Sequence, residues 1–186
     1  AAMMMRNFDE AQSALDDYPF ETLPSVLSGP IPKSYLRACV FLARGETRQA
    51  WKMFEVARPS MEAETRAHPR DSLGHARLGL LYAYMSRNDD AVREGWTAVQ
   101  LMPISQDALD GHQRECNLAL IYARVGETDR AISMVVGLLR QPGCVCPLNE
   151  ATLALWDLRV RWQWDPLRSD ARFQQIVAGP EPTTIY

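Results

Sequence analysis

The sequence lacks any long apolar run and any excess of positive charge. Its longest apolar stretch, Leu78 to Met85, is far shorter than the roughly 20 residues that cross a bilayer. The 20 Lys and Arg residues are balanced by 23 Asp and Glu residues, which gives a net charge of -3. No basic field is therefore present to bind a phosphate backbone. We expect no membrane span, and no nucleic acid as a main partner.

Cysteine and histidine are also scarce. Cys39 and Cys116 fall within apolar helical patterns, where cysteine packs as a small hydrophobic residue. Cys144 and Cys146 form a C-x-C without the second ligand pair that a zinc site needs, so they are assigned to a loop. The three histidines belong to no catalytic motif and are expected on the surface: His68, His75 and His112. We expect no enzyme, metal or cofactor.

The compartment follows from the same cysteine usage. Four cysteines without visible pairing fit a reducing environment, so a cytoplasmic location is expected. The periplasmic side of a membrane-anchored parent protein stays open as an alternative.

An internal repeat is the main feature that the sequence does contain. Three windows align, each with an apolar helix, a short turn, and an alanine that opens a second amphipathic helix: residues 36–57, 77–98 and 117–138. The marker alanines, Ala50, Ala91 and Ala131, recur with a nearly constant period of about 40 residues. Ala11 precedes Ala50 by nearly the same interval, so a partial copy precedes the three windows.

The residues at fixed places in these windows resemble the tetratricopeptide repeat (TPR) over roughly residues 6 to 142. The middle window carries the resemblance through Leu78, Gly79, Tyr82, Ala91, Ala98 and Pro103. Matching residues in the other windows are Phe41, Gly45, Ala50, Phe54 and Ala57, and Leu118, Ala119, Tyr122, Gly126 and Ala131. The resemblance implies an all-α fold, a right-handed α-α superhelix or solenoid with a C-terminal capping helix and tail.

Two departures from the TPR pattern carry expectations of their own. The period exceeds the roughly 34 residues of the usual repeat, and a HEAT-like helix pair is the competing interpretation. We assign the extra length to a second helix that continues past Ala57 and to a long first helix over 105–124. Gly95 replaces the usual aromatic residue, and Trp96 is expected to fill that space.

The expected organisation is one domain over residues 1–178. It is divided into a partial repeat 1–30, repeats 31–70, 71–104 and 105–142, a capping segment 147–178, and a loose terminus 179–186. The partial repeat lacks most of its first helix, so we interpret the chain as the C-terminal piece of a longer protein. An uncapped repeat exposes an apolar face, which makes residues 1–20 the expected site of self-association.

The C-terminal stretch from Trp162 to Phe173 breaks the repeat pattern. Together with the earlier stretch 101–111, residues 161–173 resemble the closing module of TPR arrays in bacterial signalling proteins that carry a kinase, a winged-helix regulator or a cyclase. That module ends on a W-D-P-L-R-x-D-x-R-F segment. This resemblance implies an interaction or sensor part of such a protein. We expect a helix over 148–158 with Asn149 as N-cap, and a cap built from large side chains and turn-capping acids: Trp156, Trp162, Trp164, Phe173, Asp165 and Asp170.

The first helix of each pair is expected to line a concave groove. The predicted groove residues are Tyr35, Cys39, Arg77, Leu80, Tyr84, Gln113, Asn117, Leu120 and Arg124. A mostly apolar groove with a few polar side chains is typical of a site for a helix or an extended peptide. The prediction is a non-catalytic protein- or peptide-interaction module. The chain's own tail is another candidate occupant, and a small-ligand receptor or enzyme in the same groove is the alternative function.

Overall fold

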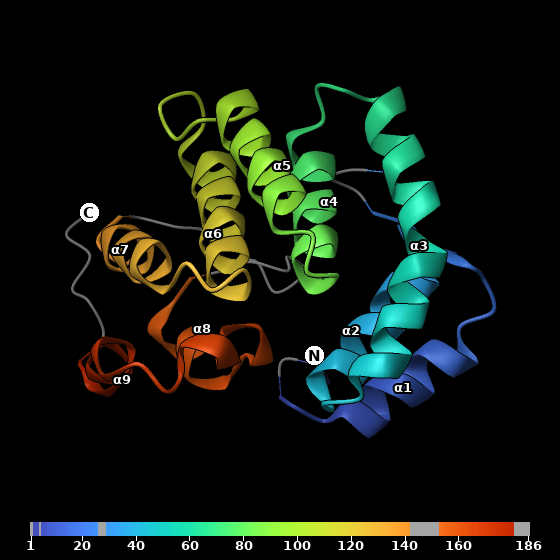
Figure 1. The fold of residues 1–186 in the computed structure, drawn as a ribbon, viewed down its shortest axis with the longest axis horizontal. Coiled ribbons are helices and arrows are strands. Elements are labelled where there is room, and N and C mark those ends of the chain that lie inside the picture. The colour runs from blue at the N-terminus through green and yellow to red at the C-terminus, as the bar shows by residue number, and fades with distance from the viewer. Residues whose placement is uncertain (1, 4, 26–28, 142–152, 181–186) are drawn as a thin grey trace.

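The computed structural model describes residues 2–3, 5–25, 29–141 and 153–180, and this part of the chain is almost entirely helical (Figure 1). The all-α expectation is therefore confirmed. None of the described helices is long and apolar enough to span a bilayer. In chain order the elements are α1 (Phe8–Asp17), β1 (Thr22–Leu23), β2 (Ile31–Pro32), α2 (Lys33–Ala43), α3 (Thr47–Ala67), α4 (Ser72–Tyr84), α5 (Asn88–Leu101), α6 (Ala108–Arg124), α7 (Thr128–Leu138), α8 (Leu155–Val160), the 3-10 helix η1 (Trp162–Leu167) and α9 (Ala171–Ala178).

Successive helices pack in pairs. α2 contacts α3, α4 contacts α5, and α6 contacts α7, while α3–α4, α4–α6 and α5–α6 contacts join the pairs. In Figure 1, α6 lies between α5 and α7. One hydrophobic cluster extends from Tyr35 in α2 through the three pairs to Phe173 in α9. The C-terminal segment therefore shares a core with the helix pairs.

The same helix-ending motif recurs in all three pairs. The chain turns just after α2, α4 and α6, and at each turn one residue has a positive φ: Gly45 (79°), Ser86 (59°) and Gly126 (85°). The next backbone N–H then donates back to a carbonyl in the last turn of the helix, as in the Schellman motif. These bonds run from Glu46 N to Phe41 O (2.8 Å), from Arg87 N to Tyr82 O (2.9 Å) and from Glu127 N to Tyr122 O (2.9 Å). The aligned sequence windows thus form equivalent turns.

α3 and α6 are the long helices that the sequence predicts, but α6 begins later than expected. α3 has 21 residues and continues past Ala57 to Ala67, as expected. α6 begins at Ala108 instead of residue 105, because the Asp107 carboxylate accepts hydrogen bonds from Leu109 N and Asp110 N, both at 2.8 Å. An N-cap of this kind fixes the start of a helix.

Trp96 does not fill the space at Gly95, so that expectation is wrong. A Cβ atom on Gly95 would lie 2.8 Å from Ile121 and 2.9 Å from Leu118, which shows that these α6 side chains occupy the space. Trp96 is 46% exposed, and its Nε1 donates to Tyr122 Oη at 2.8 Å. The small residue therefore allows α6 to approach α5 closely.

The N-terminal region contains a helix and a short hairpin, of which the hairpin was not expected. α1 packs on α2, and β1 pairs antiparallel with β2 through Thr22–Pro32 and Leu23–Ile31. Lys33, at the start of α2, is buried and donates through Nζ to Tyr18 O at 2.5 Å. Self-association through residues 1–20 stays a prediction.

The C-terminal segment packs on the helix pairs through most of its large side chains. Trp162, Trp164 and Phe173 are buried, whereas Trp156 is 42% exposed and does not contribute as expected. The Asp170 carboxylate accepts from Arg172 N at 2.8 Å and caps α9. The helix predicted over 148–158 has other bounds in the described residues: α8 begins at Leu155, after the extended residue Ala154, and ends at Val160. Asn149, Cys144, Cys146 and the end of the terminus from 181 lie outside the described residues.

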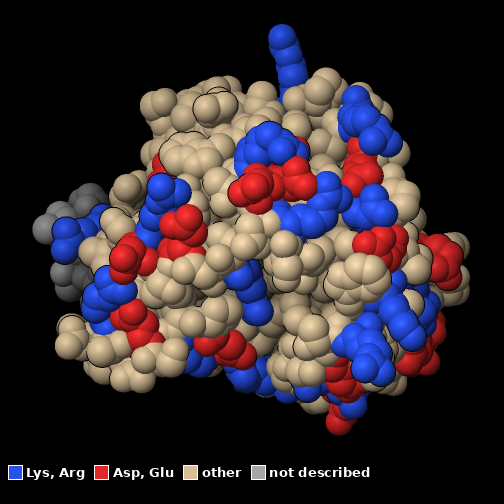
Figure 2. All heavy atoms as spheres, viewed as in Figure 1, with Lys and Arg blue, Asp and Glu red and all other residues tan. Residues whose placement is uncertain are grey.

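Charges of both signs alternate on the face shown in Figure 2. Arg87 and Arg93 both contact Asp90 at 2.6 Å, and Arg58 contacts Glu55 at 2.9 Å. Because opposite charges lie side by side, this face presents no extended field of one sign.

Candidate functional site

A row of four aromatic rings crosses the interior from α2 to η1. Tyr35 lies 5.9 Å from Phe54, Phe54 stacks on Tyr84 at 5.4 Å, and Tyr84 lies 5.8 Å from Trp162, all measured between ring centroids. The first three rings come from the helix pairs, and the fourth comes from the C-terminal segment. The row therefore joins the helix pairs to the tail.

Arg124, the last residue of α6, holds the tail in this position. Its guanidinium carbon lies 5.4 Å from the Tyr84 ring centroid and 4.9 Å from the Trp162 ring centroid. Its Nη2 donates to the Trp162 carbonyl at 3.1 Å. Arg124 thus binds both the side chain and the backbone of one residue in the tail, a combination of cation-π contact and charge-assisted hydrogen bond. We call Tyr84, Arg124 and the bound Trp162 the inner-face site.

The N-terminal segment contacts the same stretch of the tail. Arg6 Nε donates to Val160 O at 2.8 Å, and the Arg6 guanidinium forms an ion pair with Asp165. Asp165 also contacts Arg168 Nε at 2.6 Å. The segment 160–168 is therefore bound between the helix ends and residue 6.

Four polar atoms of α6 and η1 are buried without a hydrogen bond to the described part of the chain. They are Asn117 Oδ1, Arg124 Nε, Trp162 Nε1 and Gln163 Oε1. Buried polar atoms usually have a partner in the protein, in water or in a ligand. These atoms are shielded from solvent with the tail in place.

The structure separates the predicted groove residues into two groups. Six of them are buried: Tyr35, Cys39, Leu80, Gln113, Asn117 and Leu120. Tyr84 and Arg124 are half-buried and meet at the tail, whereas Arg77 extends toward the N-terminal loop and contacts Gly29 O at 3.4 Å and Ser25 Oγ at 3.2 Å. The cavity beside Arg77 is only about 30 Å³, room for about one water molecule. Binding of a partner by these residues stays a prediction.

His112 corrects the expectation that all histidines are on the surface. It is 2% exposed, with Nε2 3.2 Å from Leu138 O and Nδ1 3.5 Å from Cys116 Sγ. Burial raises the pKa of the Cys116 thiol well above its ordinary value, so this sulfur is a protonated packing group. In the described ranges, no group of three or more His, Cys, Asp or Glu side chains has the arrangement of a metal site.

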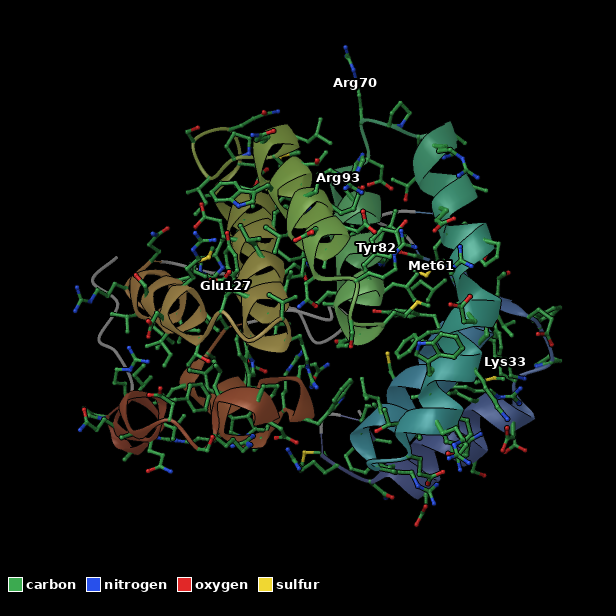
Figure 3. All side chains as sticks on the ribbon, in the orientation of Figure 1. Lys33, Met61, Arg70, Tyr82, Arg93 and Glu127 are labelled. Carbon is green, nitrogen blue, oxygen red and sulfur yellow. The ribbon has the colours of Figure 1, made fainter. Side chains whose placement is uncertain are left out.

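A polar cluster lies between α3 and the pair formed by α4 and α5, around Tyr82 (Figure 3). Tyr82 Oη donates to Glu62 at 2.9 Å, and burial raises the pKa of the Tyr82 hydroxyl to about 12. His75 Nδ1 lies 2.7 Å from Glu94 Oε2, and its Nε2 lies 3.1 Å from Pro69 O. Since both ring nitrogens face acceptors, the protonated imidazolium can make both bonds.

This geometry predicts a stability that depends on pH. The Glu94 hydrogen bond raises the pKa of His75 above its ordinary 6.5, with smaller contributions from Pro69 and Asp71. A histidine whose pKa is higher in the folded than in the unfolded state stabilises the fold. This stabilisation is fully present at pH values below the unfolded-state pKa, and it is lost as the pH rises through the folded-state pKa. From about pH 6 to about pH 9, the stability advantage of the wild type over His75→Gln should fall by about 0.5–1.5 kcal/mol.

Urea denaturation at the two pH values measures this difference. His68→Gln is the matched control, because the His68 side chain is 61% exposed. An advantage that is equal at both pH values would contradict the assignment of a charged His75.

The sequence does not predict the contact between Arg6 and the tail, and it predicts Trp162 only as a residue of the cap. The tryptophan-rich W-x-W segment is the sequence feature that points to Trp162. No sequence pattern predicts the contacts of Arg6, because its partners lie 154 and 159 residues away. In comparisons with known proteins, no family model, no curated protein and no solved structure matches the chain. The function is therefore argued from this chain's own residues.

Proposed function

We propose that the chain is a TPR-like solenoid that acts as a non-catalytic module for binding proteins or peptides. Three features support the solenoid: the regular spacing of the marker alanines, the repeated helix-ending motif, and the packing of helices in successive pairs. Stacked helix pairs of this kind form extended binding surfaces. Membership in a larger bacterial signalling protein is part of the same proposal and rests on the resemblance of the tail.

The observation that carries the proposal is the tail segment bound at the inner-face site. Arg124 binds Trp162 through its ring and its carbonyl. A site that binds a peptide within the chain has the chemistry to bind one from another protein. The partner that fits best is an extended segment with a large aromatic residue, which would compete with Trp162.

The test uses a fluorescently labelled peptide with the sequence of residues 159–169, added to the full chain carrying Trp162→Ala. This substitution removes the ring that occupies the site and leaves Arg124 in place. We expect a dissociation constant of roughly 1–100 µM by fluorescence polarisation, the range of modest peptide interfaces. The wild-type chain should bind at least about tenfold more weakly, because its own tail competes at a high effective concentration.

The matched control is the same peptide with alanine in place of the residue corresponding to Trp162. It should not bind. A Trp162→Ala chain that keeps its helical circular dichroism but does not bind the native peptide would overturn the proposal.

A further inference from the structure

A second groove is lined by residues of α5, α6 and α7. It has a volume of about 520 Å³, and it shares no residue with the inner-face site. We call it the outer groove. Its main lining residues are Trp96, Val99, Glu115, Leu118, Tyr122 and Met134.

Glu115 is the one carboxylate among the residues that line the outer groove, and it is half-buried. It forms no hydrogen bond or ion pair with any residue in the described ranges. Burial raises the pKa of its carboxyl group, with a smaller opposing influence from His112. The groove therefore carries an acidic group that makes no hydrogen bond or ion pair within the described part of the chain.

The preceding repeat shows how an equivalent groove is neutralised. The position equivalent to Glu115, one repeat earlier, holds His75, which pairs with Glu94 at 2.7 Å in a groove of about 510 Å³. The position equivalent to Glu94, one repeat later, holds Met134. The groove of the preceding repeat thus contains the His75–Glu94 ion pair. At the equivalent positions, the outer groove contains the unpaired carboxylate of Glu115 and the thioether of Met134.

We propose that the outer groove binds an arginine or lysine side chain from a partner protein, with the cationic group on the Glu115 carboxylate. Val99 and Met134, both half-buried, supply apolar contacts for the aliphatic stem, a division of roles that suits long basic side chains. The half-exposed ring of Trp96 supplies a stacking surface for the neighbouring residue of the partner. This site goes beyond the proposed inner-face function and does not depend on it.

Arg130 also lines the outer groove, but its guanidinium does not pair with Glu115. It lies 5.5 Å from the Tyr122 ring centroid and 3.7 Å from Glu127. Tyr122 follows Glu115 by about two helical turns in α6, a rise of about 10 Å along the helix. The positive charge of Arg130 is therefore at the other end of the groove.

The experiment selects a phage library of random dodecapeptides on the immobilised full chain and then measures selected peptides by isothermal titration calorimetry. We expect enrichment of arginine or lysine at one fixed position. Glu115→Gln should weaken binding at least tenfold, whereas Asp89→Asn, an exposed change of equal charge on α5, should leave it unchanged.

A second variant introduces into the outer groove the histidine–glutamate pair that His75 and Glu94 form one repeat earlier. The double substitution Glu115→His and Met134→Glu should abolish binding of the selected peptides while the helical circular dichroism is retained. The proposal is overturned if no peptide is enriched, if the enriched peptides carry no basic residue, or if either Glu115 variant binds them as tightly as the wild type.

Discussion

Replacing Trp164 with alanine is expected to lower the free energy of unfolding by about 3–5 kcal/mol, the usual cost of removing a buried tryptophan. Trp164 lies in η1 and is 0% exposed, within the hydrophobic cluster that joins the tail to the helix pairs. The loss combines the transfer free energy of a large side chain with the cavity that remains. Urea denaturation followed by circular dichroism measures it.

Trp156→Ala is the matched control for this substitution. Trp156 belongs to the same C-terminal segment but is 42% exposed. Its replacement should cost less than about 1 kcal/mol. Equal effects of the two substitutions would show that the tail does not pack on the helix pairs as described.

The second large effect is expected at the buried ion pair between Asp157 in α8 and Arg161, the residue that follows this helix. Asp157 and Arg161 have side chains that are 1% and 3% exposed, and Arg161 Nε lies 2.7 Å from Asp157 Oδ1. Asp157 Oδ2 also accepts from Ala154 N at 3.0 Å. Asp157→Leu would leave a buried guanidinium without this carboxylate, so we expect a loss of about 3–5 kcal/mol.

A double-mutant cycle separates the ion pair from the packing of α8. The double substitution Asp157→Leu and Arg161→Met removes both charges, and it should destabilise the chain less than Asp157→Leu alone. Strictly additive losses in the free energy of unfolding would contradict a coupled buried pair.

The helix pairs could be predicted from the sequence because their signals are local. Ala50, Ala91 and Ala131 share one register, and each window contains its own turn residue, such as Gly45 or Gly126. Local spacing does not determine which side chains become buried. His112 is buried because its partner, the Leu138 carbonyl, lies 26 residues away.

The candidate site could be predicted only in part for the same reason. The repeat register assigned Tyr84 and Arg124 to one face, and they do meet in the structure. The docking of Trp162 depends on a contact over 38 residues with Arg124, and Arg6 reaches the tail across 154 residues. Such contacts are set by the packing of the whole fold.

The inner-face site is tested most directly by adding Arg124→Ala to the Trp162→Ala chain and repeating the titration with the peptide of residues 159–169. Arg124 supplies a cation-π contact and a charge-assisted hydrogen bond, together worth roughly 2–4 kcal/mol. We expect a dissociation constant at least about tenfold higher, with the fold retained. An unchanged dissociation constant would mean that the peptide binds elsewhere, and would contradict the proposed role of Arg124.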